Sequence, residues 1–214
     1  MKTKKLSIIF PIILILFSFV VAIYFYPILP PQVATHWGIN SQPNGYSSKA
    51  FGLFFMPILS VFLFFIFIFL PKIDPYKKNF SQFQNYFQIF INLIFAFFFY
   101  IYLTTIIWNL GISFNMMQVL SPAFAILFYY AGVLMTHAKQ NWFVGIRTPW
   151  TMSNEKVWDK THQLGGKLFK IVGFLNLLSL PFPQFSVFFI LVPILIVTVF
   201  IFAYSYWEYR KIVI

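Results

Sequence analysis

The chain has 214 residues, of which 60% are hydrophobic, 23% are aromatic and only 9% are charged. A soluble domain of this length would not carry such an apolar excess, so the composition indicates an integral membrane protein. The net charge of +11 argues little for nucleic acid, because the basic residues cluster at the ends of apolar runs, and the absence of cysteine excludes disulfide and thiolate chemistry.

The first predicted element is an apolar run from Leu6 to about Tyr26, preceded by three lysines. At about 1.5 Å of rise per residue, this run is long enough to cross roughly 30 Å of hydrocarbon. It is longer than the apolar region of a typical signal peptide and lacks a small-x-small cleavage site before Tyr24. We therefore predict a retained first helix.

A polar segment, residues 27–49, follows the first span. It contains a Pro-Pro pair, the sequence THWG at 35–38 and the turn-like sequence PNGY at 43–46. These features predict a compact loop outside the membrane. Its candidate ligand-binding residues are His36, Trp37 and Tyr46, although a histidine in a polar loop is more often simply a hydrogen-bonded loop residue.

Five further apolar runs predict the remaining membrane spans. The polar stretch at 81–86 with interleaved aromatics predicts a surface-lying helical entry to the third span. The fifth run is shorter than a standard crossing and would need Lys167 and Lys170 as snorkelling anchors. The predicted spans lie at about 51–70, 87–108, 119–136, 168–182 and 185–207.

The distribution of Lys and Arg predicts the orientation. Counted between spans from the N-terminus, the segments carry three, one, three, zero, six, zero and two basic residues, which sum to fifteen. By the positive-inside rule, both termini and the segment around 139–167 are cytoplasmic, and the loop at 27–49 is outside. Losing the short fifth span would place Arg210 and Lys211 outside, which favours six spans over five.

The segment from Lys139 to Lys167, called the signature segment below, is the longest polar interruption of the chain. Its first half, 141–150, has the composition of an ordered loop. Its second half predicts an amphipathic helix at the membrane surface, with Ser153 as N-cap and Gly165-Gly166 as its end. One face of that helix carries Val157, Trp158, Thr161 and Leu164.

Candidate partner-binding residues in the signature segment are Arg147, Pro149, Trp150 and Trp158. Arg147 and Trp158 each have a structural alternative. The arginine can stack on the neighbouring indoles or pair with lipid phosphate, and a tryptophan at the headgroup level is common in membrane proteins.

The search for catalytic residues is mostly negative. All four acidic residues lie in loops or at the ends of spans, which disfavours a proton-coupled transporter. Asp159 and His162 are three apart on one predicted helix face, but no nucleophile stands at a fixed spacing from them. No metal-binding, phosphate-binding or dinucleotide motif is present, so the sequence predicts neither a metal site nor a cofactor.

Two motifs carry a resemblance to a known family. The run NWFVGIRTPWT at 141–151, followed by Glu155, Val157-Trp158 and Gly165-Gly166-Lys167, resembles the signature of the SdpI-like family of bacterial membrane proteins. Leu29-Pro30, the THW at 35–37 and Gly45-Tyr46 resemble the small domain of unknown function that often precedes it. The resemblance implies an immunity protein that neutralises a secreted peptide toxin, with a cytosolic transcriptional repressor as a second partner.

The predicted fold class is therefore an all-α integral membrane protein of the bacterial cell membrane, with six transmembrane helices and a cytoplasmic amphipathic helix between spans 4 and 5. The predicted units are 1–70, with two spans and an external loop at 27–50, and 71–214, with four spans and the signature segment. The predicted function is immunity or sensing, in which the protein binds its ligand and has no enzymatic activity. A small-molecule or lipid transporter or exporter is the alternative, disfavoured by the scarcity of polar residues along the spans.

Overall fold

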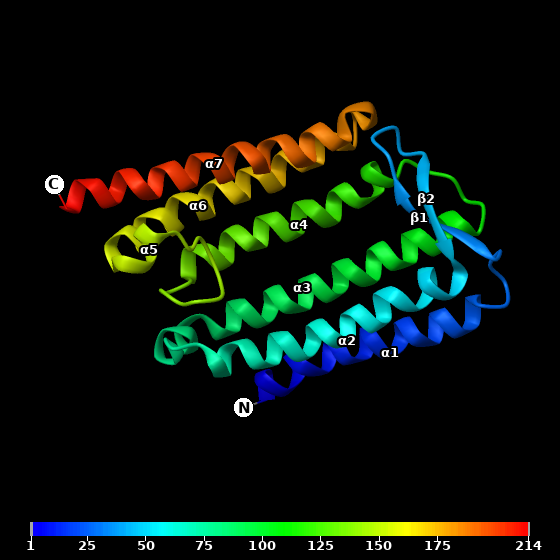
Figure 1. Ribbon diagram of the computed structural model, residues 1–214, viewed down its shortest axis with the longest axis horizontal. Helices are drawn as coiled ribbons and strands as arrows, with labels where there is room; N and C mark the ends of the chain where they lie inside the picture. Colours follow the sequence, from blue (N-terminus) through cyan, green and yellow to red (C-terminus); the bar gives the residue numbers. More distant parts are fainter. Residues whose placement is uncertain (1, 214) are drawn as a thin grey trace.

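The computed structural model describes residues 2–213, and the side chains of residues 8–212, as an elongated bundle of long helices with a small β-hairpin at one end (Figure 1). Short 3-10 turns, η1 (Leu177–Ser179) and η2 (Pro183–Phe185), connect the last two long helices. The helices are α1 (Lys2–Phe25), α2 (Lys49–Ile73), α3 (Lys77–Asn109), α4 (Met116–His137), α5 (Pro149–Ser153), α6 (Glu155–Asn176) and α7 (Ser186–Val213), and the strands are β1 (Gln32–Trp37) and β2 (Pro43–Ser48).

Five of these helices, α1, α2, α3, α4 and α7, are long and apolar enough to cross a membrane. They include all but the fifth of the predicted spans. Their outward side chains are large and apolar yet exposed, for example Ile23 at 65% and Val199 at 70%. Such surfaces are stable against lipid and unfavourable in water, which makes the chain a multi-pass membrane protein.

The loop predicted to be external, residues 27–49, folds as an antiparallel β-hairpin, an element that the predicted all-α class did not contain. Strands β1 and β2 pair from Gln32 opposite Ser48 to Trp37 opposite Pro43, with irregular register near His36. Gly45 sits against His36, where an added Cβ would lie 2.9 Å from the histidine Cβ. The expectation of a compact segment is therefore confirmed, and its regular structure comes from backbone pairing.

Helix α6 differs most from the expectation. Its N-cap is Asn154, not Ser153, and it continues through Gly165-Gly166 to Asn176 as one helix. The predicted surface helix and the first part of the predicted fifth span are therefore a single element, and 168–182 is not a helix of its own. In Figure 1, α6 runs along the bundle between α4 and α7, so the face that carries Val157 and Trp158 is buried against other helices.

Glycines allow α6 to approach α4 closely. An added Cβ at Gly166 would lie 2.6 Å from the carbonyl oxygen of Gly132, and one at Gly173 would lie 2.7 Å from that of Ala125. Small residues at such spacing let helix backbones pack together in a membrane. The two glycines that predicted a helix end instead lie inside a helix contact.

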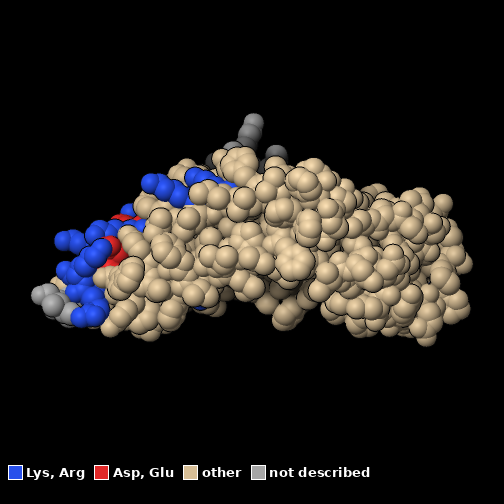
Figure 2. Space-filling model, turned by 90° about the horizontal axis from the view of Figure 1, so that it is seen from above, with Lys and Arg blue, Asp and Glu red and all other residues tan. Residues whose placement is uncertain are grey.

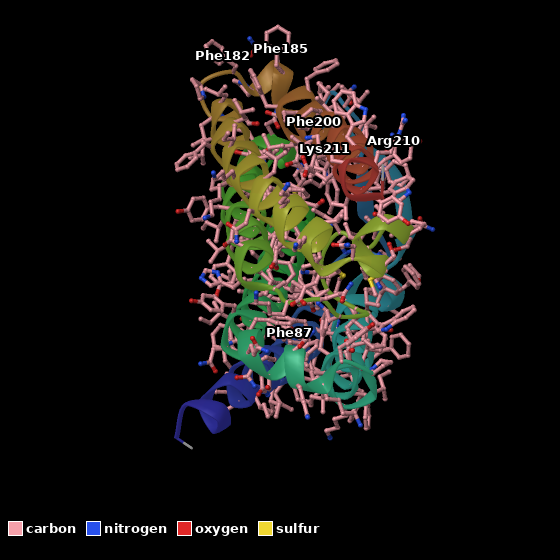
Figure 3. All side chains as sticks on the ribbon, turned by 90° about the vertical axis from the view of Figure 1, so that its left-hand side faces the viewer. Phe87, Phe182, Phe185, Phe200, Arg210 and Lys211 are labelled. Atoms are coloured by element: carbon pink, nitrogen blue, oxygen red, sulfur yellow. The ribbon has the colours of Figure 1, made fainter. Side chains whose placement is uncertain are left out.

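The charged residues gather at one end of the bundle, called the basic end below, where the chain termini also lie (Figures 1 and 2). Figure 3 looks at the molecule from this end, with Arg210 and Lys211 on the last turn of α7. The α2–α3 turn and the signature segment are here too. The stretch at 81–86, expected to lie on the surface, forms the first turns of the continuous helix α3, where Phe83 is fully buried.

The β-hairpin lies at the opposite end, called the hairpin end below, beside the C-terminal end of α3, the start of α4 and the α6–α7 turn (Figure 1). Two buried clusters connect it to the helices. Leu29 and Val33 pack with α1, α2 and α3, and Ala34 and Trp37 pack with the first turns of α4.

Candidate functional site

The β-hairpin is held rigidly to the ends of two helices by amide side chains. The carboxamide of Asn109, at the end of α3, accepts a hydrogen bond from the Ala34 N–H at 2.8 Å and donates one to the Ala34 carbonyl at 3.0 Å. This two-bond pairing imitates the next strand of the sheet, because an amide side chain carries both a donor and an acceptor.

Asn115 connects three elements at the hairpin end. Its Oδ1 caps α4 by accepting from the Gln118 N–H at 2.9 Å and accepts from the Ser41 hydroxyl of the hairpin at 2.8 Å. Its Nδ2 faces the Pro183 carbonyl in the α6–α7 turn at 3.5 Å. Gln118 adds a second bond to that turn, from its Nε2 to the Leu180 carbonyl at 2.8 Å.

A groove of about 960 Å³ lies between the hairpin and the start of α7. Its polar rim includes His36 and Asn44, whose side chains are 2.5 Å apart at Nδ1 and Oδ1. The remaining lining residues are Trp37, Gly38, Ile39, Asn40, Asn115, Met117, Pro183, Gln184, Val187 and Leu191.

The structure brings two of the three predicted external residues into this groove. His36 and Trp37 line it, and the Trp37 ring also stands edge-on against Trp108, with ring centroids 5.7 Å apart. Tyr46 is 59% exposed on β2 and is not among the groove residues. Sequence reasoning missed Asn115 and Gln184, because nothing near them in the sequence indicates that α4 and α7 begin beside the hairpin.

At the basic end, the first half of the signature segment is ordered around the buried side chain of Asn141. Its Oδ1 accepts from the N–H groups of Phe143 and Val144, and its Nδ2 donates to the carbonyls of Lys139 and Val144. Four bonds from one buried amide fix the loop, which confirms the expectation of an ordered segment.

His162 fixes the loop to α6. Its Nε2 accepts from the Ile146 N–H at 2.9 Å, so the proton is on Nδ1, which donates to the Trp158 carbonyl at 2.9 Å. Burial disfavours the charged ring and lowers the pKa of His162 to about 4, although the bond to the Trp158 carbonyl acts in the opposite direction. Gly145, with φ of +108°, lies directly against Nε2 and leaves no room for a side chain.

The predicted partner-binding residues occupy different environments. Arg147 and Pro149 are exposed, and the Arg147 guanidinium donates to the Trp142 carbonyl. Trp150 packs on Phe202 and Tyr206 of α7. Trp158 is fully buried, contrary to its expected place at the headgroup level, and its Nε1 donates to the Ala138 carbonyl at 2.8 Å.

Acidic side chains connect the signature segment to the rest of the bundle. The buried Asp74 carboxylate, in the α2–α3 turn, accepts from the N–H of Tyr76 at 2.7 Å and of Trp142 at 3.0 Å. Glu208 of α7 accepts from Lys160 at 2.6 Å and from Lys211 at 2.7 Å. The signature segment is thus bonded both to the N-terminal helices and to α7.

The suggested acid/base pair is not assembled. Asp159 is half exposed and pairs with Lys139 at 3.6 Å, whereas His162 is buried and bonded to backbone groups. Within the described residues, no group of three or more His, Asp or Glu side chains is arranged to hold a metal ion.

Comparison with known proteins agrees with these two ordered regions. Residues 137–206 match the model of the SdpI/YfhL protein family, and residues 13–61 match DUF1648, a domain of unknown function. The predicted resemblance to the SdpI-like family is confirmed. The SdpI/YfhL match covers the signature segment, all of α6 and most of α7, and the DUF1648 match covers the second half of α1, the hairpin and the first half of α2.

One curated relative extends the similarity over nearly the whole chain. The chain is 26% identical over 202 residues to a protein named Immunity protein SdpI from Bacillus subtilis (strain 168), which covers 94% of this chain and 95% of that protein. No solved structure gives a significant match.

Proposed function

We propose that this chain is a multi-pass membrane immunity protein that binds a secreted antimicrobial peptide and neutralises it at the hairpin end. The observation that carries the proposal is the similarity to an immunity protein over almost the full length of both chains. The groove beside the hairpin supports it, because a preformed hollow with a few polar groups is the usual form of a binding site.

In this proposal the chain crosses the bacterial cell membrane six times, with both termini in the cytoplasm and residues 168–182, the second half of α6 and the turn after it, as the fifth crossing. Support comes from the path of the chain, since α4 ends at the basic end, α7 starts at the hairpin end, and α6 covers the distance between them (Figure 1). The basic residues agree with this orientation, because Lys49 is the only Lys or Arg at the hairpin end among the side chains that the structure describes.

A second binding surface, for a cytosolic transcriptional repressor, is proposed at the basic end. Arg147 and Pro149 are exposed there, and Trp150 is partly so. Ligand at the hairpin end would alter this surface through α4 and α6, which contact both ends. Trp158 is left out, because its burial keeps it from any partner.

Survival of a toxin-sensitive Bacillus strain tests the proposal. We expect the wild-type chain to protect against a Bacillus killing-factor peptide, His36→Ala to weaken protection, and Ile23→Ala on the lipid-facing side of α1 to leave it intact. Arg147→Ala should keep protection and lose recruitment of cytosolic protein to the membrane. Absence of protection by wild type at verified expression would overturn the toxin-binding proposal.

A further inference from the structure

The groove at the hairpin end combines two kinds of surface. Amide and imidazole side chains from the hairpin, from the start of α4 and from η2 form one part of its lining, namely Asn40, Asn44, His36, Asn115 and Gln184. Apolar side chains form the other, with Ile39 at the hairpin tip, Met117 on α4, and Val187 and Leu191 on successive turns of α7.

Among the side chains that the structure describes, residues 8–212, no Lys, Arg, Asp or Glu lines the groove. The chain's four acidic residues all lie in elements of the basic end, and Lys49 points over the Tyr26 ring at 4.8 Å, outside the groove lining. A charged ligand segment would find no opposite charge to offset its desolvation. The groove is therefore suited to an uncharged segment.

The apolar wall of the groove continues onto the lipid-facing surface of α7. Leu191 is 51% exposed, and Leu195, one turn further along the same membrane-spanning helix, is 62% exposed. Ile39 is 70% exposed at the hairpin tip, although the hairpin is outside the spans. Apolar surface in these places is stable where lipid or an apolar ligand covers it.

The polar side chains of the groove supply hydrogen-bond partners that a peptide backbone lacks within the membrane. A peptide segment without complete internal hydrogen bonding leaves N–H and C=O groups unpaired in lipid, which is energetically unfavourable because lipid offers them no partner. Carboxamides both donate and accept, so they can pair with either backbone group. Asn115 is fixed in place because its Oδ1 accepts bonds from α4 and the hairpin, which leaves its Nδ2 as the group that can donate to a ligand carbonyl.

From these observations we infer that the groove binds an uncharged, apolar segment of the peptide, which enters sideways past α7 from within the outer leaflet. The backbone groups of this segment would pair with the amide side chains, and its apolar side chains would pack against Val187 and Leu191. This inference rests on the proposed function for the identity of its ligand. It adds the route of entry and the chemistry of the segment, which distinguish capture within the membrane from capture in the external solution.

Adjacent positions on α7 give a matched test of the contact. Val187 lines the groove and Phe188 does not, although both lie in the first turn of the same helix. With full-length protein in nanodiscs of phosphatidylethanolamine and phosphatidylglycerol, we expect Val187→Lys to weaken binding of a synthetic Bacillus killing-factor peptide at least 10-fold. Phe188→Lys should change the affinity for the peptide less than 2-fold. Gln184→Ala should weaken that affinity about 3- to 10-fold, which is the effect of losing one hydrogen bond.

Photo-crosslinking tests the route. A photoreactive amino acid at Leu191 should capture the peptide in nanodiscs, excess unlabelled peptide should compete with it, and the same probe at Ile23, exposed to lipid on α1, should capture none. Capture of phospholipid alone at Leu191, without competition by peptide, would overturn the inference in favour of a lipid site.

The two proposals fail in different ways. If the wild type binds the peptide and protects cells, but Val187→Lys and Phe188→Lys behave alike, the groove inference is wrong and the immunity proposal stands. If the wild-type chain neither protects cells nor binds the peptide in nanodiscs, both are wrong for this ligand class.

Discussion

Lowering the pH should destabilise the protein through His162. In the folded protein this ring is 1% exposed, neutral and stacked on Trp158, with ring centroids 3.8 Å apart. Its pKa is lowered from 6.5 to about 4. Between these values the unfolded chain binds a proton that the folded chain does not, so stability is complete above pH 6.5 and is lost as the pH falls toward 4.

The difference between the two pKa values gives the size of the effect. At about 1.4 kcal/mol for each tenfold difference in proton affinity, a folded-state pKa near 4 corresponds to about 3 kcal/mol of stability lost over the whole range. About 2 kcal/mol of this is already lost at pH 5. On the scale of soluble domains of similar length, that loss lowers Tm by about 5 °C.

Thermal unfolding in detergent at pH 7.5 and pH 5 measures this effect. We expect His162→Gln to be less stable than wild type at pH 7.5 but to lose less stability on going to pH 5. His137→Gln is the matched control, because His137 is an exposed histidine near the same level, and it should retain the wild-type pH dependence. An equal loss in wild type and His162→Gln would refute the assignment of a buried neutral ring at this position.

Three further substitutions test the packing. Gly166→Val should destabilise the fold by about 1–3 kcal/mol or more, because the added valine side chain would meet the backbone of α4. The control Ile126→Val, at a lipid-facing side chain, should change stability by less than about 0.5 kcal/mol in the same thermal assay. Asp74→Ala should remove two hydrogen bonds and increase amide hydrogen exchange in the first half of the signature segment, and unchanged exchange there would contradict the proposed connection. Trp158→Phe should lower stability by about 1 kcal/mol through its lost indole bond, and Trp207→Phe, at a side chain 63% exposed on α7, should have no measurable effect.

Local composition determined the membrane-spanning character of the chain and most of its helices. Runs of Phe, Leu and Ile long enough to cross a bilayer leave the backbone little choice, since lipid offers no other hydrogen-bond partners. The same local logic predicted order at 141–150 and a compact segment at 27–49. Spacing alone also placed Val157, Trp158 and Thr161 on one face, and all three are buried.

The surface against which the face of Val157, Trp158 and Thr161 packs was decided only by the tertiary structure. An apolar stripe on a basic helix has the same pattern whether it covers lipid headgroups or another helix. Gly165-Gly166 is ambiguous in the same way, because glycine ends helices in water but permits close helix contacts in a membrane. The neighbouring glycine on α4 that resolves the ambiguity lies more than thirty residues earlier in the chain.

Of the features described, the groove was the least predictable from the sequence, because its residues meet only in the tertiary structure. His36 and Trp37 were identifiable from their unusual place in a polar loop, but Asn115, Gln184, Val187 and Leu191 come from two other parts of the chain. Each looks locally like a helix start or an ordinary membrane-facing residue. The sequence by itself determined that this chain enters a membrane with an ordered segment at each side, because burial of apolar runs is a local property. Only the folded arrangement decided which residues meet at the hairpin end, because contacts between helices depend on packing over the whole chain.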